Sequence, residues 1–261
     1  MNIAPPPFGY TKKKPAYTGA VDATSGKPVP NSAAQWGNLI STHYMYNMQN
    51  PTNLYLSQEG SGNLSDSIGA MTLTANATPA YAQAVPGWTR VGVKGNGSTT
   101  SQRFANLSAP NPSLTSVAVF GYVYCGTFDS TARGIYTWGQ NTDIEVSGLL
   151  VSGKSVIRFR IHSSTTVDGT FDYTNTVTPI LMVHDITNSR ARLWTSQEKY
   201  TPTYGTTASN TNFAYGNIPG GSWSVSTIMY TALWTGAAAE SITDACAKAL
   251  FQAVGYTTPW T

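Results

Sequence analysis

Residues 54–74, LYLSQEGSGNLSDSIGAMTLT, decide the fold class of this chain. Leu54–Leu56 predicts a short strand, and the Gly, Ser, Asn and Asp residues crowded into 61–69 predict a turn. Met71 and Leu73 then alternate with polar neighbours, which is typical of a second strand. The stretch therefore marks the start of a folded domain built from short antiparallel strands.

Strand signals continue along the rest of the chain. The strongest is Ser116–Cys125, where valines alternate with Phe120, Tyr122 and Tyr124, so the two kinds of side chain face opposite ways. Tight turns at 152–154 and 187–190 predict hairpins. The other expected strands are Arg90–Lys94, Gly134–Trp138, Asp143–Val151, Ser155–His162, Val177–Ile186, Ala191–Ser196 and Ser222–Trp234.

Two helices and one long loop complete the expected elements. Asn31–Met48 has approximate helical spacing of its apolar residues, with Asn31 or Ser32 as the cap. Ser241–Ala253 begins with Ser241-x-x-Asp244, which resembles a capping box. Residues 197–221 predict a loop, because Thr, Tyr, Asn, Gly and Pro dominate them.

These elements predict an all-β fold, a two-sheet antiparallel jelly-roll sandwich with one short helix near each end. The expected organisation is an extended arm over residues 1–30, a short helical connector over 31–49 and a sandwich over 50–261.

Composition excludes several function classes. Only 10% of residues are charged and the net charge is +3, which argues against nucleic-acid binding. No apolar run approaches ~18 residues, so no membrane insertion is expected. The first residues lack the apolar core of a signal peptide, which predicts assembly in a cytoplasm. Cys125 and Cys246 are expected to be buried thiols.

The arm is rich in proline and lysine, which prevents a helix and favours extended structure. It is expected to lie along its own domain or along a partner chain, and we favour the partner. The residues expected to dock are Pro5, Pro6, Pro7, Phe8, Tyr10, Lys12, Lys13, Lys14 and Tyr17.

Three segments resemble the concanavalin A-like lectin/glucanase superfamily, in its laminin G-like branch. Residues 54–74 are similar to its opening strand, x-x-D-x-x-G and strand, with Asp66 and Gly69 in place. Residues 178–194, TPILMVHDITNSRARLW, are similar to its central hairpin, and residues 229–250 to its final strand and helix. The resemblance covers roughly residues 50–255 and depends on the order of the segments.

The resemblance implies a jelly roll that often binds carbohydrate or protein, sometimes holds calcium and is in a few members a glycosidase. Similar domains occur in virion proteins of bacteriophages. The main interpretation is therefore a non-enzymatic structural or adhesive phage protein on the virion surface, in the capsid decoration or tail. Its expected partners are other virion proteins, further copies of itself and cell-surface glycans. The alternative is a soluble carbohydrate-binding lectin module.

Catalysis is the least favoured interpretation. Glucanases that the chain resembles carry alternating carboxylates on one strand, and the nearest match here is Asn141-Thr142-Asp143-Ile144-Glu145. Asn141 cannot serve as a nucleophile. Asp143 and Glu145 then remain as sugar-binding residues, as an acid–base pair of an inverting glycoside hydrolase or, the favoured interpretation, as a solvated strand edge.

Ligand-binding candidates lie mainly in loops. Aromatic side chains can stack on sugars or anchor a protein partner, or they can close the ends of the core. No cofactor is expected, although a calcium ion has three candidate ligands in Asp129, Asp168 and Asp172. The aromatic candidates are Tyr200, Tyr204, Phe213, Tyr215 and Trp223.

Overall fold

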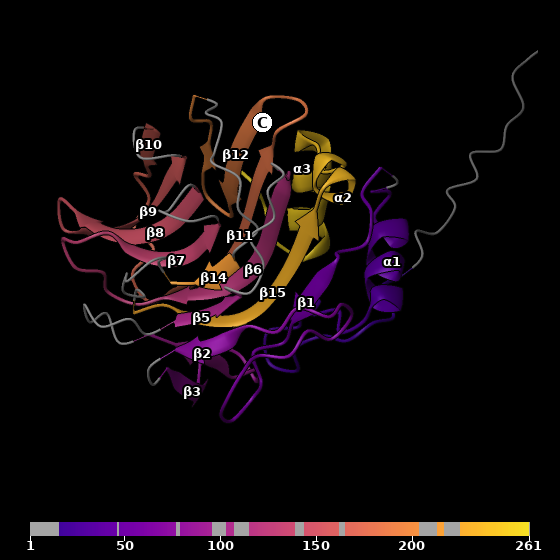
Figure 1. Cartoon of the computed structure of the whole chain (residues 1–261), viewed down its shortest axis with the longest axis horizontal. Coiled ribbons are helices and arrows are strands. Elements are labelled where there is room, and N and C mark those ends of the chain that lie inside the picture. The colour runs from indigo at the N-terminus through magenta and orange to yellow at the C-terminus, as the bar shows by residue number, and fades with distance from the viewer. Residues whose placement is uncertain are drawn as a thin grey trace, which may run out of the picture.

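The fold is a sandwich of two antiparallel β-sheets with a layer of helices against one of them (Figure 1). It was obtained as a computed structural model of the 261-residue chain. The residues that the structure describes are 16–45, 47–76, 79–95, 103–106, 115–138, 144–161, 165–203, 213–216 and 225–260. The predicted fold class is confirmed.

One sheet has eight strands in the order β13-β12-β11-β6-β15-β4-β3, with β1 paired to β15. Its central strand β6 is the strand that the alternation of valines and aromatic residues predicts. The strands are β1 (Asn53–Tyr55), β3 (Ala80–Gln83), β4 (Gly92–Lys94), β6 (Val117–Cys125), β11 (Thr176–Asp185), β12 (Arg190–Thr195), β13 (Lys199–Tyr200) and β15 (Thr227–Thr235).

The other sheet has seven strands in the order β10-β9-β8-β7-β14-β5-β2. Two residues with positive φ, Ser152 and Gly153, make the tight turn between β8 and β9. The strands are β2 (Thr74–Asn76), β5 (Arg103–Asn106), β7 (Arg133–Trp138), β8 (Ile144–Val151), β9 (Lys154–Ile161), β10 (Thr165–Asp168) and β14 (Phe213–Tyr215).

Two hydrophobic cores share the eight-stranded sheet. Val119 and Val123 of β6 face the core between the sheets, together with Ile157 and Phe159 of β9. Phe120 and Tyr122 face the second core, beneath the helices. The helices are α1 (Ala33–Thr42), α2 (Ala237–Glu240) and α3 (Asp244–Ala253). Among the described residues, no helix is long and apolar enough to span a membrane.

Asp66 organises the opening segment on which the fold prediction rests. Its Oδ1 accepts hydrogen bonds from the backbone N–H groups of Leu54, Ile68 and Gly69 at 2.9, 3.1 and 2.9 Å. The amide of Asn53 donates to Oδ2. Gly69 is required here because a Cβ atom would lie 2.6 Å from the carbonyl oxygen of Thr52. The Asp-x-x-Gly pattern is therefore a structural turn that ties β1 to the following loop.

The described part of the arm, residues 16–30, docks on its own domain, against the preference for a partner chain. The hydroxyls of Tyr122 and Tyr230 donate to the carbonyl oxygens of Pro28 and Pro30, both at 2.8 Å. Half-buried Tyr17 donates to Ala20, and burial raises the pKa of its phenol to about 12. The other residues predicted to dock lie outside the described residues.

Some local expectations need correction. The 197–221 region is not one loop, because β13 and β14 form within it and β14 lies between β5 and β7. Thr243, rather than Ser241, caps α3 by accepting a bond from the backbone N–H of Cys246 at 3.2 Å. Ser241 directly follows α2, and its hydroxyl donates to the carbonyl oxygen of Ala238 in that helix. Cys125 and Cys246 are buried free thiols, as predicted.

Candidate functional site

The outer face of the seven-stranded sheet carries a row of side chains in one register. Alternate residues of β8 and β9, such as Ile144 and Ile161, face the inter-sheet core, so the residues between them face outward. The pairing of neighbouring strands aligns one outward residue from each of the seven strands. From β10 to β2 these residues are Thr166, Arg160, Glu145, Thr137, Ala214, Ala105 and Thr74.

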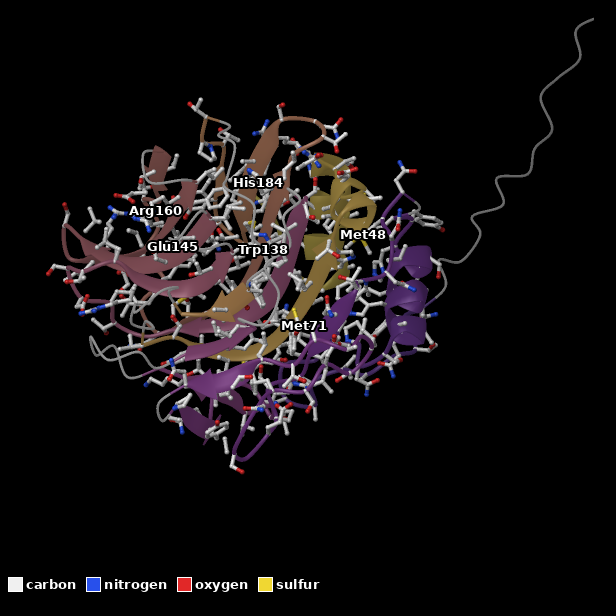
Figure 2. All side chains as sticks on the ribbon, in the orientation of Figure 1. Met48, Met71, Trp138, Glu145, Arg160 and His184 are labelled. Atoms are coloured by element: carbon white, nitrogen blue, oxygen red, sulfur yellow. The ribbon has the colours of Figure 1, made fainter. Side chains whose placement is uncertain are left out.

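Two arginine–carboxylate pairs lie at the β8–β10 end of this face. The guanidinium of Arg160 donates to the carboxylate of Glu145 on the neighbouring strand, and Figure 2 shows the two side chains together. Arg158 binds Asp168 through Nε at 2.6 Å and through a second nitrogen at 2.9 Å. Hydrogen bonding to Asp168 raises the pKa of Arg158. We call Glu145, Arg158, Arg160 and Asp168 the arginine patch.

The arginine patch is partly open to solvent. The side chains of Arg158 and Arg160 are 27% and 29% exposed, and that of Asp168 is 35% exposed. Glu145 is covered, with 3% of its side chain exposed. It is therefore neither solvated nor at a sheet edge, and the expectation of a solvated edge residue is wrong. Burial of Glu145 fixes its carboxylate, which in turn orients the exposed guanidinium of Arg160.

Beside the patch, the hydroxyl of Ser147 has no hydrogen-bond partner among the described residues, although Ser147 is 0% exposed. It lies on β8 opposite Arg158 and two residues from Glu145. A buried polar atom normally has a partner, so this hydroxyl is an exception, but its burial keeps it out of reach of a ligand on the patch. Chemically, the site offers guanidinium donors beside carboxylate acceptors.

Three of the five predicted aromatic residues are core residues. Tyr200, Phe213 and Tyr215 are 2%, 0% and 0% exposed and lie between the sheets. Their rings have no face open to solvent, so the prediction that they bind a glycan or partner is wrong. These side chains instead fill the core between the sheets. Tyr204 and Trp223 lie outside the described residues.

The three calcium candidates do not converge and already have other partners. Asp129 pairs with Arg133 at 3.3 Å, and Asp168 pairs with Arg158. Asp172 accepts bonds from the backbone N–H groups of Ser155 and Thr174, both at 3.0 Å. Within the ranges that the structure describes, no group of three or more His, Cys, Asp or Glu could hold a metal ion.

The proposed acid–base pair can be placed only in part. Glu145 has Arg160 as its charge partner, whereas Asn141 and Asp143 lie outside the described residues. His162 also lies outside the described residues. His184 is buried in the sheet and His43 bonds the end of α1.

No protein-family model and no curated protein sequence matches the chain. Solved structures do match, at low sequence identity. A Trypanosoma rangeli sialidase in complex with sialic acid matches with TM-score 0.56 and 8% identity over 77% of this chain and 32% of that chain. The complex of this sialidase with the inhibitor DANA matches with TM-score 0.54, 11% identity and coverages of 76% and 32%.

The binding domain of botulinum neurotoxin serotype D matches with TM-score 0.50 and 10% identity, over 77% of this chain and 50% of that one. Of the sialidase chains that it matches, the chain spans about a third of the length. At these identities the likeness shows a shared sandwich fold. No family assignment follows from it, and the laminin G-like resemblance stays an interpretation.

The sialidase matches correct the prediction that the chain is not an enzyme. That prediction took the sandwich as a fold of binding and structural proteins and relied on the missing carboxylate at Asn141. The fold matches chains described as sialidases, one of them with a covalent intermediate, at TM-score 0.54. The sandwich thus does not place this chain outside the enzymes.

The arginines of the patch are the site residues that the sequence analysis missed, although a signal for them exists. The tight turn at Ser152–Gly153 pairs Val151 with Lys154. Counting back along both strands then pairs Glu145 with Arg160 and Ser147 with Arg158. Hairpin register alone therefore predicts an arginine opposite the glutamate.

Proposed function

We propose that this chain is a carbohydrate-binding module and that its ligand lies on the arginine patch of the seven-stranded sheet. The single observation that carries the proposal is the pair of fixed arginine–carboxylate bridges at the β8–β10 end of the outer face. There the side chains of Arg158 and Arg160 are 27% and 29% exposed, whereas Thr137 and Ala214 further along the same row are buried. The opposite sheet uses its outer face to pack α1 and α3, so that face is occupied.

The chemistry of the patch suits a polyhydroxylated ligand. Sugar hydroxyls both donate and accept hydrogen bonds, and the patch offers guanidinium donors beside carboxylate acceptors on adjacent strands. The bridges hold Arg158 and Arg160 in place before a ligand arrives, which lowers the entropy lost on binding. The two sialidase structures in complex with sialic acid and with the inhibitor DANA support sialylated glycans as the first ligands to test.

The virion interpretation remains a prediction from the sequence. None of the structural neighbours described above is a phage protein, and the expected virion partners, homo-oligomer and virion-surface location have no support from the fold. A carbohydrate-binding role fits both a virion protein and a module of a larger enzyme, so it does not depend on that interpretation.

A glycan array with sialylated and neutral oligosaccharides tests the proposal. The wild-type chain is expected to bind a subset of the array. Arg160→Ala should weaken binding to the best ligand by about tenfold to a hundredfold, since it removes charge-assisted hydrogen bonds of about 1.5–3 kcal/mol. Arg192→Ala is the matched control, because Arg192 lies on β12 of the other sheet.

Equal weakening by Arg160→Ala and Arg192→Ala would contradict the proposed location, and an array without any hit would contradict the function itself. Cleavage of the best ligand by the wild-type chain would show that the chain is an enzyme and would contradict its role as a binding module. Thermal unfolding of each variant checks that the fold is retained.

A further inference from the structure

A hollow lies where residues 16–30 meet the loop after β1 and the loop before β4. It measures about 240 Å³, and we call it the Arg90 hollow. None of the residues that line it belongs to a strand of either sheet, so it is separate from the arginine patch. The residues that line the hollow are Val21, Asp22, Ala23, Gln58, Thr89 and Arg90.

Arg90 brings a guanidinium with few partners to this hollow. Its side chain is half-buried, and among the described residues it makes one long hydrogen bond, from Nη2 to the carbonyl oxygen of Leu56 at 3.4 Å. The amide of Gln58 donates to the same oxygen at 3.2 Å, so two donors share this acceptor. Nε of Arg90 is covered by the protein, which leaves the N–H groups of the two terminal nitrogens for a ligand. Burial of this cation lowers its pKa.

Asp22 lines the same hollow, but other donors already occupy its carboxylate. It accepts hydrogen bonds of 2.8–3.2 Å from four backbone N–H groups, those of Thr24, Ser25, Thr89 and Arg90. Burial raises the pKa of Asp22, but these bonds outweigh burial and lower the pKa below its ordinary value. In the described part of the chain, no ion pair joins this carboxylate to the guanidinium of Arg90. The charge of Arg90 is therefore left for a ligand.

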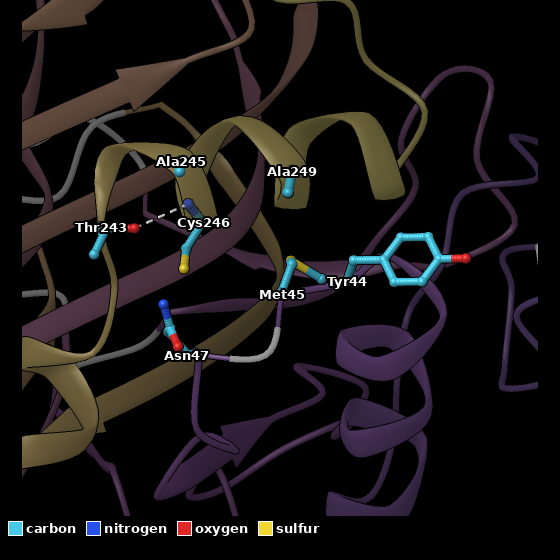
Figure 3. A pocket seen from close by; sticks show the side chains of 7 residues that line it. All are labelled: Tyr44, Met45, Asn47, Thr243, Ala245, Cys246 and Ala249. Atoms are coloured by element: carbon cyan, nitrogen blue, oxygen red, sulfur yellow. Dashed lines mark hydrogen bonds between the residues drawn. The ribbon is translucent and has the colours of Figure 1, made fainter. Parts of the chain in front are cut away.

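Figure 3 shows a second cavity, of about 210 Å³, between α3 and the segment that follows α1. The thiol of Cys246 points from the first turn of α3 toward the segment that carries Met45 and Asn47. None of the described residues that line this cavity carries a charge. It thus lacks the feature that would attract an anion, and it provides an internal reference for binding at the Arg90 hollow.

We propose that the Arg90 hollow binds the carboxylate of a small organic acid, with the two terminal nitrogens of Arg90 donating to its oxygens. The planar guanidinium matches a carboxylate, because parallel N–H groups meet both oxygens. The charge of Asp22 in the wall disfavours phosphate, which carries more negative charge at pH 7. Small-molecule sites usually enclose about 300–1,000 Å³, so a smaller hollow suits an acid of a few carbon atoms. Val21 and Ala23 supply an apolar wall for its carbon chain.

Titration of the full-length chain with acetate, followed by nuclear magnetic resonance at constant ionic strength, tests this proposal. The Nε–H signal of Arg90 and the backbone N–H signal of Ala23 should shift and saturate. The expected dissociation constant is on the order of 1–10 mM, since one bidentate contact holds the acid. The methyl signal of Met45, in the second cavity, should stay unshifted.

Arg90→Met removes the donors but keeps an apolar stem, and it should weaken acetate binding at least about tenfold. Arg192→Met, on β12, is the matched control and should leave binding unchanged. Thermal unfolding checks that each variant keeps the fold. Should Arg90→Met fail to fold, Arg90→Lys replaces it, because lysine keeps the charge but lacks the planar fork and should also weaken binding.

Three results would overturn the proposal. The first is a wild-type titration in which the signals of Arg90 and Ala23 do not saturate, and the second is equal binding by the Arg90 variant and the Arg192 variant. The third is tighter binding of inorganic phosphate than of acetate, which would reject a carboxylate as the ligand. A shift of Met45 as large as that of Ala23 would likewise contradict a site specific to the Arg90 hollow.

Discussion

At the scale of single residues, Asp66 holds the start of the sandwich together. One carboxylate accepts bonds from four backbone N–H groups and from the amide of Asn53. We expect Asp66→Ala to lower the free energy of unfolding by roughly 2–4 kcal/mol, because bonds to a charged group contribute about 1.5–3 kcal/mol each and do not add fully. Urea unfolding measures this. Asp168→Ala, at a half-exposed ion pair, should cost about 1 kcal/mol or less. Equal losses would contradict the role of Asp66.

Glu198 links the loop after β10 to β13 and gives stability a pH dependence. Burial disfavours its charged form, but hydrogen bonds from Thr170, Tyr200 and Phe171 outweigh burial and lower the pKa of Glu198 below its ordinary value of 4.5. A lowered native pKa means that the stabilisation is complete above pH 4.5 and is lost as the pH falls through the native value. In urea unfolding from pH 6 to pH 3, Glu198→Gln should be less stable than wild type at pH 6 and lose less stability on acidification. Parallel curves would contradict this.

At the scale of elements, β6 depends on a residue without a side chain. Gly121 lies at the centre of this strand, and a Cβ atom there would approach the hydroxyl of Tyr136 and lie 2.6 Å from the carbonyl oxygen of Tyr230. We expect Gly121→Ala to destabilise the fold by about 1–3 kcal/mol, as overpacking does. The control is Gly60→Ala, where nothing lies within 4 Å of the added atom. A loss no larger than that of Gly60→Ala in thermal unfolding would refute the close packing at β6.

The elements that the sequence predicts well are those with local signals. Alternation identifies β6, and turn residues identify the hairpins of β8 with β9 and of β11 with β12. β14 has only three residues, and its pairing partners β5 and β7 are distant in sequence, so no local pattern marks it. The docking of residues 16–30 is equally non-local, because it depends on the hydroxyls of Tyr122 and Tyr230.

The candidate site, too, could be predicted only where a local sequence signal exists. Glu145 stands out in the sequence as a carboxylate on a strand, and hairpin register pairs it with Arg160. Its burial depends on packing that local patterns do not report. The aromatic candidates failed for a related reason, because Phe213 and Tyr215 look like loop residues until β14 places them in the core.

At the scale of the whole molecule, the helical layer is part of the sandwich. The sequence predicts a short helical connector over residues 31–49. Within it, Trp36 is 0% exposed, donates to Tyr230 at 2.7 Å and contacts Trp234 edge-on. We expect Trp36→Ala to lower the unfolding free energy by about 3–5 kcal/mol with a single cooperative transition. Calorimetry measures both. An unchanged main transition would show that the connector is independent of the sheets.

The two sheets also differ in what packs against their outer faces. α1 and α3 cover the outer face of the eight-stranded sheet, and the aromatic residues there pack into the second core. The seven-stranded sheet carries the arginine patch on its outer face. We therefore attribute ligand binding to the second sheet and stability to the first.

Nuclear magnetic resonance of the arginine side chains tests this assignment most directly. The best glycan from the array is titrated into the wild-type chain, and the Nε–H signals of Arg158, Arg160 and Arg192 are followed. The account predicts saturable shifts for Arg158 and Arg160 and none for Arg192, which lies on β12 of the other sheet. Binding that leaves the signals of Arg158 and Arg160 unshifted would contradict it.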